Sequence, residues 1–474
     1  MIRTLVVRLD SAGDVLLAGP AVRAAAHGSS YTAMLCGPQG EQAARLLPGV
    51  DDVLVYDAPW VGLEPPPVRR GDHEALIEAV SAGRFDRALI LASYHQSPLP
   101  IALLLRMAGV RWIAADSEHY PGSLLDLRHR RAAAQHEARA ALALAEAAGF
   151  ALPAGDDGAL RVRDTADTTH LTGEDPYLVV HPGAAVPARA WSPERAARAV
   201  AALDAAGHRV VVTGGPGEKE LTAAVAGEYG LDLGGRTDLR ELAGVLSRAR
   251  AVVTGNTGPS HLAAAVGAPV VCLFAPVVPA ERWAPYGVPH VVLGRQDAPC
   301  AGTRARECPV PGHPCLDSVT DAELLSAVGR LTGTSTEGPA RPAAASERAA
   351  APRTAVVPER QAAPGRSAAP PPAAGSGPAS RPAPYSDPAS AVPCGGPAPA
   401  APSRDPASAA PRGDPGAPPV STILPDGAGP ADPVAPPDPA APPERAAPPR
   451  PTVPTACPAG PAAPATGDPE WRTA

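Results

Sequence analysis

Short runs of apolar residues, many of them β-branched, recur along the chain as far as residue 294. Longer Ala-rich and mixed stretches separate these runs. Short apolar runs bounded by polar or glycine-containing loops are typical of strands that are buried on both faces. The pattern predicts strands at residues 4–9, 31–36, 52–56, 87–92, 111–115, 177–181, 209–214, 251–255, 269–275 and 290–294.

The stretches between the strands have helical character. Residues 15–28 and the Ala-rich residues 131–149 are predicted helices, and Ser192-Pro193 is a helix-start signal for residues 192–207. Strands that alternate with helices imply parallel βαβ units. Because this alternation occurs twice, we predict an α/β fold of two doubly wound, Rossmann-like domains that face a cleft.

The composition divides the chain into parts. The two predicted domains occupy residues 1–150 and 177–332, and a loop-like linker of residues 151–176 joins them. From residue 333 to residue 474 the chain is almost wholly Pro, Ala, Gly, Ser and scattered charge, and much of the total of 63 prolines lies there. Such a segment has too little apolar surface to offset its ordering entropy, so we predict a disordered Pro/Ala-rich tail.

Charge and hydropathy exclude several classes of function. The formal net charge is −7, which provides no electrostatic footprint for nucleic acid. The first residues contain too short an apolar run for a secretory signal, and the most apolar later stretch is interrupted by Arg106 and Arg111. Seven cysteines in a chain of this length do not form a small secreted disulfide framework. We therefore predict a cytoplasmic protein.

The loop after the first strand reads "RLDSAGDVLL". A dinucleotide fingerprint needs G-x-G-x-x-G, and only Gly13 is present, which argues against an NAD enzyme. Two carboxylates, Asp10 and Asp14, flank the small turn. Asp14 lies at the start of a predicted helix, where it is either an N-cap or a general base that points into the cleft.

Three polar loops follow strands of the second half. They read "HPGAAVPARAW", "TGGPGEKE" and "GNTGPSH", and all three lie at the carboxyl edge of the predicted sheet. Ligands of open α/β sheets bind at this edge, and helix N-termini there favour anions. The loops supply a cation and helix N-termini for a diphosphate, and a carboxylate for ribose hydroxyls. The chain has no Asp-x-Asp pair, so a metal-bridged nucleotide site is disfavoured.

In these motifs the chain resembles glycosyltransferase family 9, the ADP-heptose:lipopolysaccharide heptosyltransferases and their relatives. The resemblance covers roughly residues 1–331. "SAGD" matches the S-x-G-D motif, "HPGA…W" ends at Trp191 with the basic residue at Arg189, "GGPGEKE" matches the G-G…E turn, and "NTGPSHLAAA" matches D-T-G-x-x-H-L-A-A-A. Asn256 stands where the family usually has Asp, and Ala184-Ala185 stand where hydroxyl residues are usual, so the donor sugar is left open.

The resemblance implies a GT-B fold and an inverting sugar transfer. Asp14 would be the catalytic base, and the N-terminal and C-terminal domains would face the acceptor and the nucleotide-sugar donor, respectively. Arg189 and the amides around Thr257 would stabilise the departing diphosphate, and Glu218 would contact the ribose. The implied acceptor is a lipopolysaccharide-like or other glycan or glycolipid, with presentation at the inner membrane face as one option. Neither a cofactor nor a metal is expected. The donor-binding set is Ser11, Gly13, Arg189, Glu218, Asn256, Thr257, Gly258 and His261.

Other interpretations stay open. His261 is either a ligand contact or a satisfied structural histidine. Cys300, Cys308, His313 and Cys315 form a conceivable zinc set, but the spacing lacks C-x₂-C, so a structural role is preferred. At the level of the whole protein, the same fold could serve a nucleotide-sugar epimerase, which would turn over donor without acceptor. A third option is a non-catalytic domain that displays an interaction tail, and retention of Asp14 and Arg189 argues against it.

Overall fold

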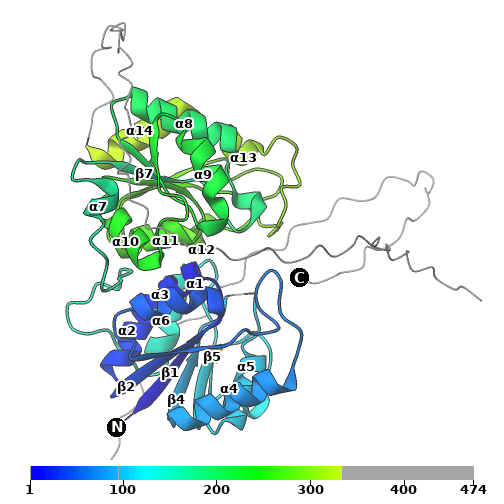
Figure 1. Cartoon of the computed structure of the whole chain (residues 1–474). Helices are drawn as coiled ribbons and strands as arrows, with labels where there is room; N and C mark the ends of the chain where they lie inside the picture. The colour runs from blue at the N-terminus through cyan, green and yellow to red at the C-terminus, as the bar shows by residue number, and fades with distance from the viewer. Residues whose placement is uncertain (1, 94, 334–474) are drawn as a thin grey trace, which may run out of the picture. The chain divides into compact units, whose positions relative to one another are not determined.

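The computed structural model describes residues 2–93 and 95–333 (Figure 1). The predicted disordered tail falls on residues 334–474, which lie outside the described residues. The predicted domain boundaries at residues 150 and 177 remain a prediction. Of the helices in the described ranges, none combines the length and the apolar character needed to cross a membrane.

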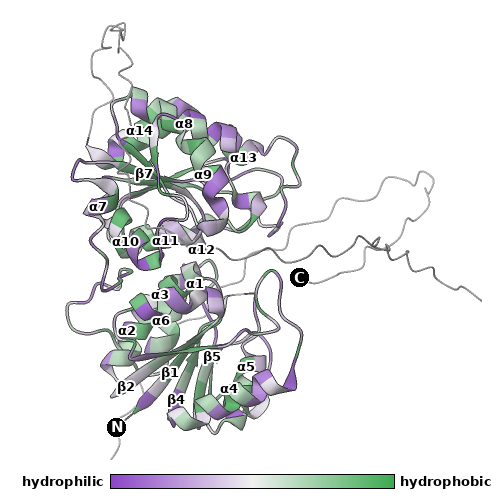
Figure 2. Ribbon diagram, in the orientation of Figure 1, coloured by the Kyte–Doolittle hydropathy of each residue, from purple (hydrophilic) through white to green (hydrophobic). Residues whose placement is uncertain are grey.

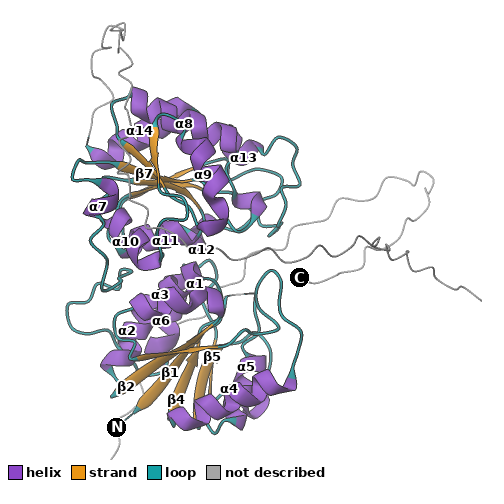
Figure 3. Ribbon diagram, viewed as in Figure 1, coloured by secondary structure: helices purple, strands orange, loops and turns teal. Residues whose placement is uncertain are grey.

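The described chain contains two parallel sheets, as the sequence predicts, and each sheet has six strands where the sequence predicts five (Figure 3). The first sheet has the order β3-β2-β1-β4-β5-β6 and the second has the order β12-β11-β10-β7-β8-β9. The second order is the first with its strands renumbered and read from the other end, so the chain uses one doubly wound topology twice. The strands are β1 (Arg3–Arg8), β2 (Tyr31–Cys36), β3 (Asp52–Val55), β4 (Arg87–Ile90), β5 (Trp112–Asp116), β6 (Leu127–His129), β7 (Leu178–His181), β8 (Val210–Val212), β9 (Gly230–Asp232), β10 (Val252–Gly255), β11 (Val270–Leu273) and β12 (His290–Leu293).

The helices cover both faces of each sheet, which explains why the strands are apolar throughout (Figure 2). Along β1, Leu5 and Val7 pack with residues of α4 and α5, whereas Val6 points to the other face and packs with α2 and α6. The helices that follow strands of the first sheet are α1 (Ala12–Leu17), α2 (Gly19–His27), α3 (Glu41–Leu46), α4 (Arg70–Gly83), α5 (Leu99–Met107) and α6 (Glu137–Ala147).

The second sheet is covered in the same way. Val180 of β7 packs with α8, α9 and α14, and Val179 points to the opposite face with α10 and α11. The helices of this half are α7 (Thr169–Thr172), α8 (Pro193–Ala205), α9 (Lys219–Ala226), α10 (Leu239–Ser247), α11 (Gly258–Ala265), α12 (Ala280–Trp283), α13 (Pro314–Asp317) and α14 (Asp321–Thr332), with 3-10 turns η3 (Pro187–Arg189) and η4 (Pro216–Glu218).

The sheet orders fix where a site can form. In the first sheet the chain continues from β1 to β2 on one side, and β4 lies on the other, so the loops after β1 and β4 diverge around a crevice. The same holds for β7 and β10 in the second sheet. Ligands of doubly wound folds bind at such switch points. The loops after β1, β7 and β10 carry "DSAGD", "PGAAVPAR" and "NTG".

Some predicted elements are wrong in detail. The single helix predicted over residues 15–28 is two helices, because Pro20 has no N–H with which to continue the first one. The helix predicted from residue 131 starts at Glu137, after Ala134 has taken a left-handed conformation with φ 54°. The sequence pattern also misses β6 and β9, which have three residues each and carry little apolar signal.

Candidate functional site

The loops after β1 and β10 meet where helix α1 packs on helix α11. Gly13 makes this approach possible. A Cβ at this position would lie 3.0 Å from His261 Cδ2 and 3.1 Å from Gly258 Cα, which is closer than most real Cβ contacts. The absence of a side chain at Gly13 therefore brings Asp14 next to the start of α11, and the predicted residues Gly13, Gly258 and His261 lie together.

Asp14 lies in the first turn of α1, and the N-cap position belongs to Ser11. The interpretation of Asp14 as an N-cap is therefore wrong. Its Oδ2 accepts a hydrogen bond from Ser11 Oγ at 2.8 Å, and its Oδ1 accepts one from Arg8 Nη2 at 2.9 Å. The side chain keeps 21% of its surface exposed, so a substrate hydroxyl can reach it.

Arg8, the last residue of β1, is the central residue of this cluster. Its side chain is 3% exposed, and its Nε lies 2.8 Å from Asp10 Oδ2. Its Nη2 donates to Asp14 and also to Ser93 Oγ at 2.8 Å, and its Nη1 lies 3.8 Å from Glu137 Oε2. Arg8 is not among the residues predicted from the sequence. The available signal was a charged residue within an apolar run typical of a buried strand, because charged residues are buried only when they are paired.

The surroundings of Asp10 and Asp14 shift the pKa values of these two carboxyl groups in opposite directions. Burial acts to raise the pKa of Asp14, but the Arg8 guanidinium and the Ser11 hydroxyl outweigh it and hold the pKa below its usual value. Burial raises the pKa of Asp10 to about 6, although Arg8 opposes the shift. Carboxylates whose environments push their pKa values apart can serve as proton acceptor and proton holder. Asp14 is thus ionised at neutral pH, and Asp10 is the carboxylate that takes up a proton first as the pH falls.

The loop after β4 contributes three residues that sequence reasoning missed: Ser93, His95 and Gln96. Ser93 binds Arg8, and Gln96 Nε2 donates to Asp10 Oδ1. Burial lowers the pKa of His95 to about 4, Arg304 and Arg8 lower it further, and Asp14 opposes them. Because β4 is the neighbour of β1, the sheet order places these side chains beside Asp14. That order was not available from the local pattern.

Arg189 and His261 face the same cluster from the second half of the chain. Arg189 Nε is buried and has no hydrogen-bond partner within the described residues. Burial lowers the pKa of Arg189, and the nearby Asp14 carboxylate opposes the shift. Burial also lowers the pKa of His261 to about 4, so its ring is neutral at pH 7. The unpartnered Arg189 guanidinium can bind an anion. The ionised Asp14 carboxylate next to it can accept a proton, and the neutral His261 ring adds no charge.

The neutral ring of His261 gives a pH prediction. A histidine with a folded pKa of about 4 binds fewer protons in the folded than in the unfolded state, so it destabilises the fold as the pH drops below about 6.5. In the wild type this histidine should lower the free energy of unfolding by about 2 kcal/mol between pH 7 and pH 5. We expect His261→Gln to lack this contribution. Denaturant unfolding at both pH values measures it, with exposed His27→Gln as the control. An unchanged slope in His261→Gln would show that this ring does not titrate as described.

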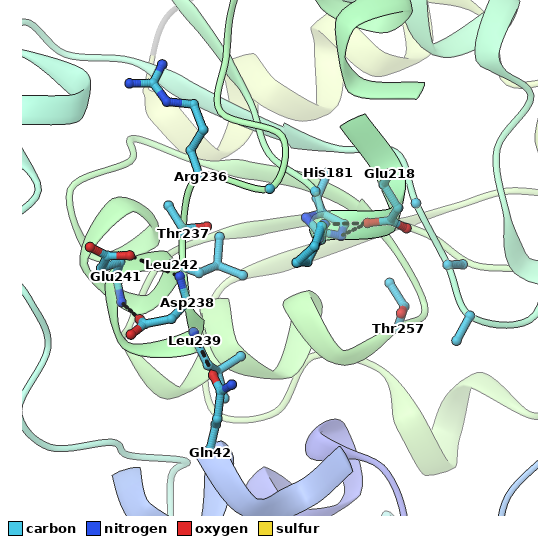
Figure 4. A pocket seen from close by; sticks show the side chains of 17 residues that line it. Gln42, His181, Glu218, Arg236, Thr237, Asp238, Leu239, Glu241, Leu242 and Thr257 are labelled. Atoms are coloured by element: carbon cyan, nitrogen blue, oxygen red, sulfur yellow. Dashed lines mark hydrogen bonds and ion pairs between the residues drawn. The ribbon is translucent and has the colours of Figure 1, made fainter. Parts of the chain in front are cut away.

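A cavity of about 670 Å³ lies beside this cluster in the second half (Figure 4). Of the predicted site residues, Glu218 and Thr257 line it, and Asp14, Arg189, Asn256 and His261 do not. Thr257 precedes Gly258 and so connects the cavity wall to the α1–α11 contact. The remaining lining residues are Gln42, His181, Gly183, Ala184, Ala185, Gly214, Gly215, Pro216, Gly235, Arg236, Thr237, Asp238, Leu239, Glu241 and Leu242.

Glu218 is fixed at the cavity wall. Its Oε2 accepts a hydrogen bond from the Gly215 N–H at 2.7 Å and lies 3.9 Å from His181 Nε2. A Cβ at Gly183 would lie 1.9 Å from Glu218 Oε1, so the glycine makes room for the carboxylate. Figure 4 shows Glu218 and His181 directed toward one another. The carboxylate is held at a defined position from which it can accept hydrogen bonds from a ligand.

Asn256 is occupied elsewhere. Its side chain is buried, its Nδ2 donates to Ala275 O at 3.3 Å, and its Oδ1 accepts from Ala275 N at 3.2 Å. An ionised Asp could accept from the N–H but could not donate to the carbonyl. The amide therefore joins the ends of β10 and β11, and this pairing gives a structural reason for Asn at this position.

Sequence reasoning missed the side of the cavity that follows β9. Arg236 and Asp238 lie in the segment between this strand and α10, and Asp238 caps α10 by accepting from Glu241 N at 2.7 Å. Gln42, from α3 of the first half, accepts from Leu239 N at 3.0 Å. Since β9 was not predicted, nothing indicated that residues 234–238 lie at the sheet edge.

The cysteine segment has no metal-binding geometry. No group of three or more His, Cys, Asp or Glu within the described residues is placed to hold a metal ion. Cys300 and Cys315 are buried, and burial raises the pKa of the Cys315 thiol to about 11. His313 Nε2 instead donates to Ala188 O at 3.2 Å, which fastens the segment to the turn that carries Arg189.

Comparison with known proteins identifies the family to which the chain belongs. A family model described as glycosyltransferase family 9 (heptosyltransferase) matches residues 73–313, just over half of the chain. The chain belongs to this family. The match includes the loops after β7, β8 and β10 but not the loop with Asp14, so the role of Asp14 depends on the geometry described above.

Individual relatives are more distant. The lipooligosaccharide heptosyltransferase 2 of Haemophilus influenzae is 33% identical over 119 residues, which are 23% of this chain and 34% of the relative. The chain spans between about a third and a half of the length of the curated relatives it matches. Among solved structures, a family 9 glycosyltransferase from Veillonella parvula aligns with a TM-score of 0.56 at 19% identity, and an Escherichia coli heptosyltransferase with ADP aligns at 0.52 and 20%. These alignments cover 70% of this chain and 98% and 100% of the others, and they show that the family's fold is shared.

Proposed function

We propose that this protein is an inverting glycosyltransferase. It would move a sugar, a heptose or a relative of heptose, from a nucleoside-diphosphate donor to a hydroxyl group of a lipopolysaccharide-like or other glycan acceptor. The observation that carries the proposal is the placement of the ionised Asp14 carboxylate beside the buried Arg189 guanidinium and the start of α11. This arrangement supports a proton acceptor next to an anion site, as transfer from a diphosphate leaving group requires.

In this proposal Asp14 takes the proton of the acceptor hydroxyl. The acceptor oxygen then forms a bond to the anomeric carbon while the bond from that carbon to the diphosphate oxygen breaks on the opposite face. Arg8 and Ser11 hold the carboxylate through 2.9 Å and 2.8 Å hydrogen bonds. A base fixed in this way contributes about 10²–10⁴-fold to the rate.

The second half would bind the donor. The diphosphate accumulates charge as it leaves, and Arg189 together with the free N–H groups at the start of α11 would stabilise it. The cavity of about 670 Å³ is large enough for a nucleoside, and Glu218 would accept hydrogen bonds from its ribose hydroxyls. Ser11 and Gly13 would form the acceptor-side wall next to the sugar.

Family membership supports a first proposal for the donor and for the location. The Escherichia coli structure with ADP supports an adenosine diphosphate donor for this chain as the first one to test. We place the enzyme in the cytoplasm, where nucleotide sugars would reach it, with an acceptor presented at the inner face of the membrane.

The experiment is a thermal-shift screen of the full chain against ADP-, GDP-, UDP- and dTDP-sugars, followed by transfer to glycan acceptors. Magnetic resonance of the product should show the anomeric configuration opposite to that of the donor. Turnover of donor without acceptor would instead support an epimerase. If none of the four donor classes stabilises the protein, the proposal is wrong.

A further inference from the structure

The connection between β12 and α13 lies against the turn that carries Arg189. Ala188 N donates to Arg306 O at 2.8 Å, and His313 Nε2 donates to Ala188 O at 3.2 Å. Both bonds are made by the residue immediately before Arg189. This connection, which the family motifs described above do not include, therefore belongs to the walls of the site.

Arg304, in the same connection, has an unfavourable backbone conformation. Its φ is 59°, in the left-handed region that L-residues other than Gly, Asn and Asp seldom occupy. The conformation is held from both sides: Arg304 N donates to Val277 O at 2.8 Å, and Gly302 N donates to Pro276 O at 2.8 Å. Strained residues of this kind concentrate at ligand-binding sites.

Arg304 and Arg189 are two cations without a salt bridge. Burial lowers the pKa of Arg189, the nearby Asp14 carboxylate opposes the shift, and the positive charge of Arg304 lowers the pKa further. Within the described residues neither guanidinium has a hydrogen bond or a salt bridge, and Arg189 Nε is buried. In contrast, Arg8 and Arg131 nearby are each paired with carboxylates. Two neighbouring arginines that form no salt bridge can bind one anion together.

We infer that Arg304 and Arg189 together bind the diphosphate of the donor, with Arg304 as the second cation. The inference rests on the proposed function. A diphosphate carries at least two negative charges, and arginine suits phosphate oxygens because its planar guanidinium can donate two parallel hydrogen bonds. Both arginines come from the half that contains the nucleoside-sized cavity. The loop from Gly183 to Ala185 lines that cavity and leads directly into the turn with Arg189.

The decisive variant is Arg304→Gly, because glycine fits the left-handed backbone and removes the guanidinium together with the rest of the side chain. Isothermal calorimetry on the full chain compares ADP, GDP, UDP and dTDP, and the tightest of these is then compared with its nucleoside. We expect Arg304→Gly to weaken nucleoside diphosphate binding by about 10–100-fold and to leave nucleoside binding within about twofold of the wild type.

Arg304→Lys should recover part of the affinity, since lysine keeps the charge but cannot donate two parallel hydrogen bonds. The melting temperature of Arg304→Gly should equal or exceed that of the wild type, because the strain is relieved.

Two controls separate the possible failures. Arg295→Ala removes a cation from the same connection, but Arg295 pairs with Asp297 at 3.4 Å, so its diphosphate affinity should match the wild type. Arg189→Ala should lose affinity, as Arg304→Gly does. If the wild type binds none of the four diphosphates, the proposed function fails. If the wild type binds and Arg304→Gly binds equally well, or loses nucleoside affinity to the same extent, only the role of Arg304 is wrong. An increase in acceptor KM alone would also overturn the diphosphate assignment.

Discussion

Asp14→Asn should lower the turnover number by about 10²–10⁴-fold and leave the donor dissociation constant nearly unchanged. A base that accepts a proton only in the transition state contributes nothing to donor binding in the ground state. The amide has nearly the size of the carboxylate, and its oxygen can still accept from Arg8 or Ser11, whose bonds are 2.9 Å and 2.8 Å long in the wild type. Transfer rates under saturating substrates, together with calorimetric donor titration, measure the two quantities.

This variant should also lose stability. Asp14 pairs with the buried Arg8 rather than capping α1, and hydrogen bonds to charged groups contribute about 1.5–3 kcal/mol. Asp10→Asn is the matched control, because it removes the other carboxylate of Arg8, at 2.8 Å, without removing the proposed base. Activity lost in Asp10→Asn but retained in Asp14→Asn would move the base to Asp10. If both variants unfold, measurement at a lower temperature distinguishes catalysis from folding.

Arg8→Met should cost about 3–5 kcal/mol of the free energy of unfolding, the usual result of removing one partner from a buried ion pair. The loss would leave Asp10, Asp14 and Glu137 close together without their shared cation. Carboxylates in this situation have raised pKa values, so the folded state binds more protons than the unfolded state. The variant should therefore lose stability more steeply than the wild type as the pH rises above about 4, because in the wild type Arg8 opposes the rise of the Asp10 pKa, which stays at about 6. Denaturant unfolding at pH 5 and pH 8 measures the effect.

Two further variants test the reason for that loss. Arg8→Lys keeps the charge, but a single ammonium cannot contact Asp10, Asp14 and Ser93 from the separate nitrogens that Arg8 uses, so an intermediate loss is expected. Arg3→Met, at the other end of the same strand, removes an arginine that stacks on Tyr31 at 3.9 Å and should cost only about 1 kcal/mol. Equal losses in Arg3→Met and Arg8→Met would contradict the role assigned to the buried cluster.

The sequence by itself determined the class of fold and most of the loops that form the site. Strands that are buried on both faces must be apolar along their length. This produces runs of consecutive apolar residues, such as those of β2 and β11, that can be recognised in the sequence. Motif spacing after a strand then places Asp14, Arg189 and Thr257 at sheet edges, because a loop that leaves a parallel strand opens there. These inferences need only local information, and the two parallel sheets and the family membership confirm the fold and the resemblance. The site roles remain predictions.

The tertiary structure decided which side chains meet. Arg8 is one charge in a strand until the sheet order brings Ser93, after β4, and Glu137, at the start of α6, to its guanidinium. Asn256 has the spacing of a ligand residue, but the register of β10 with β11 pairs it with Ala275. The segment that contains Arg304 lies against the turn that contains Arg189 because Ala188 forms hydrogen bonds with Arg306 and His313, more than a hundred residues away. Such contacts depend on strand order and register across the whole chain, and no local pattern of apolar and polar residues encodes them.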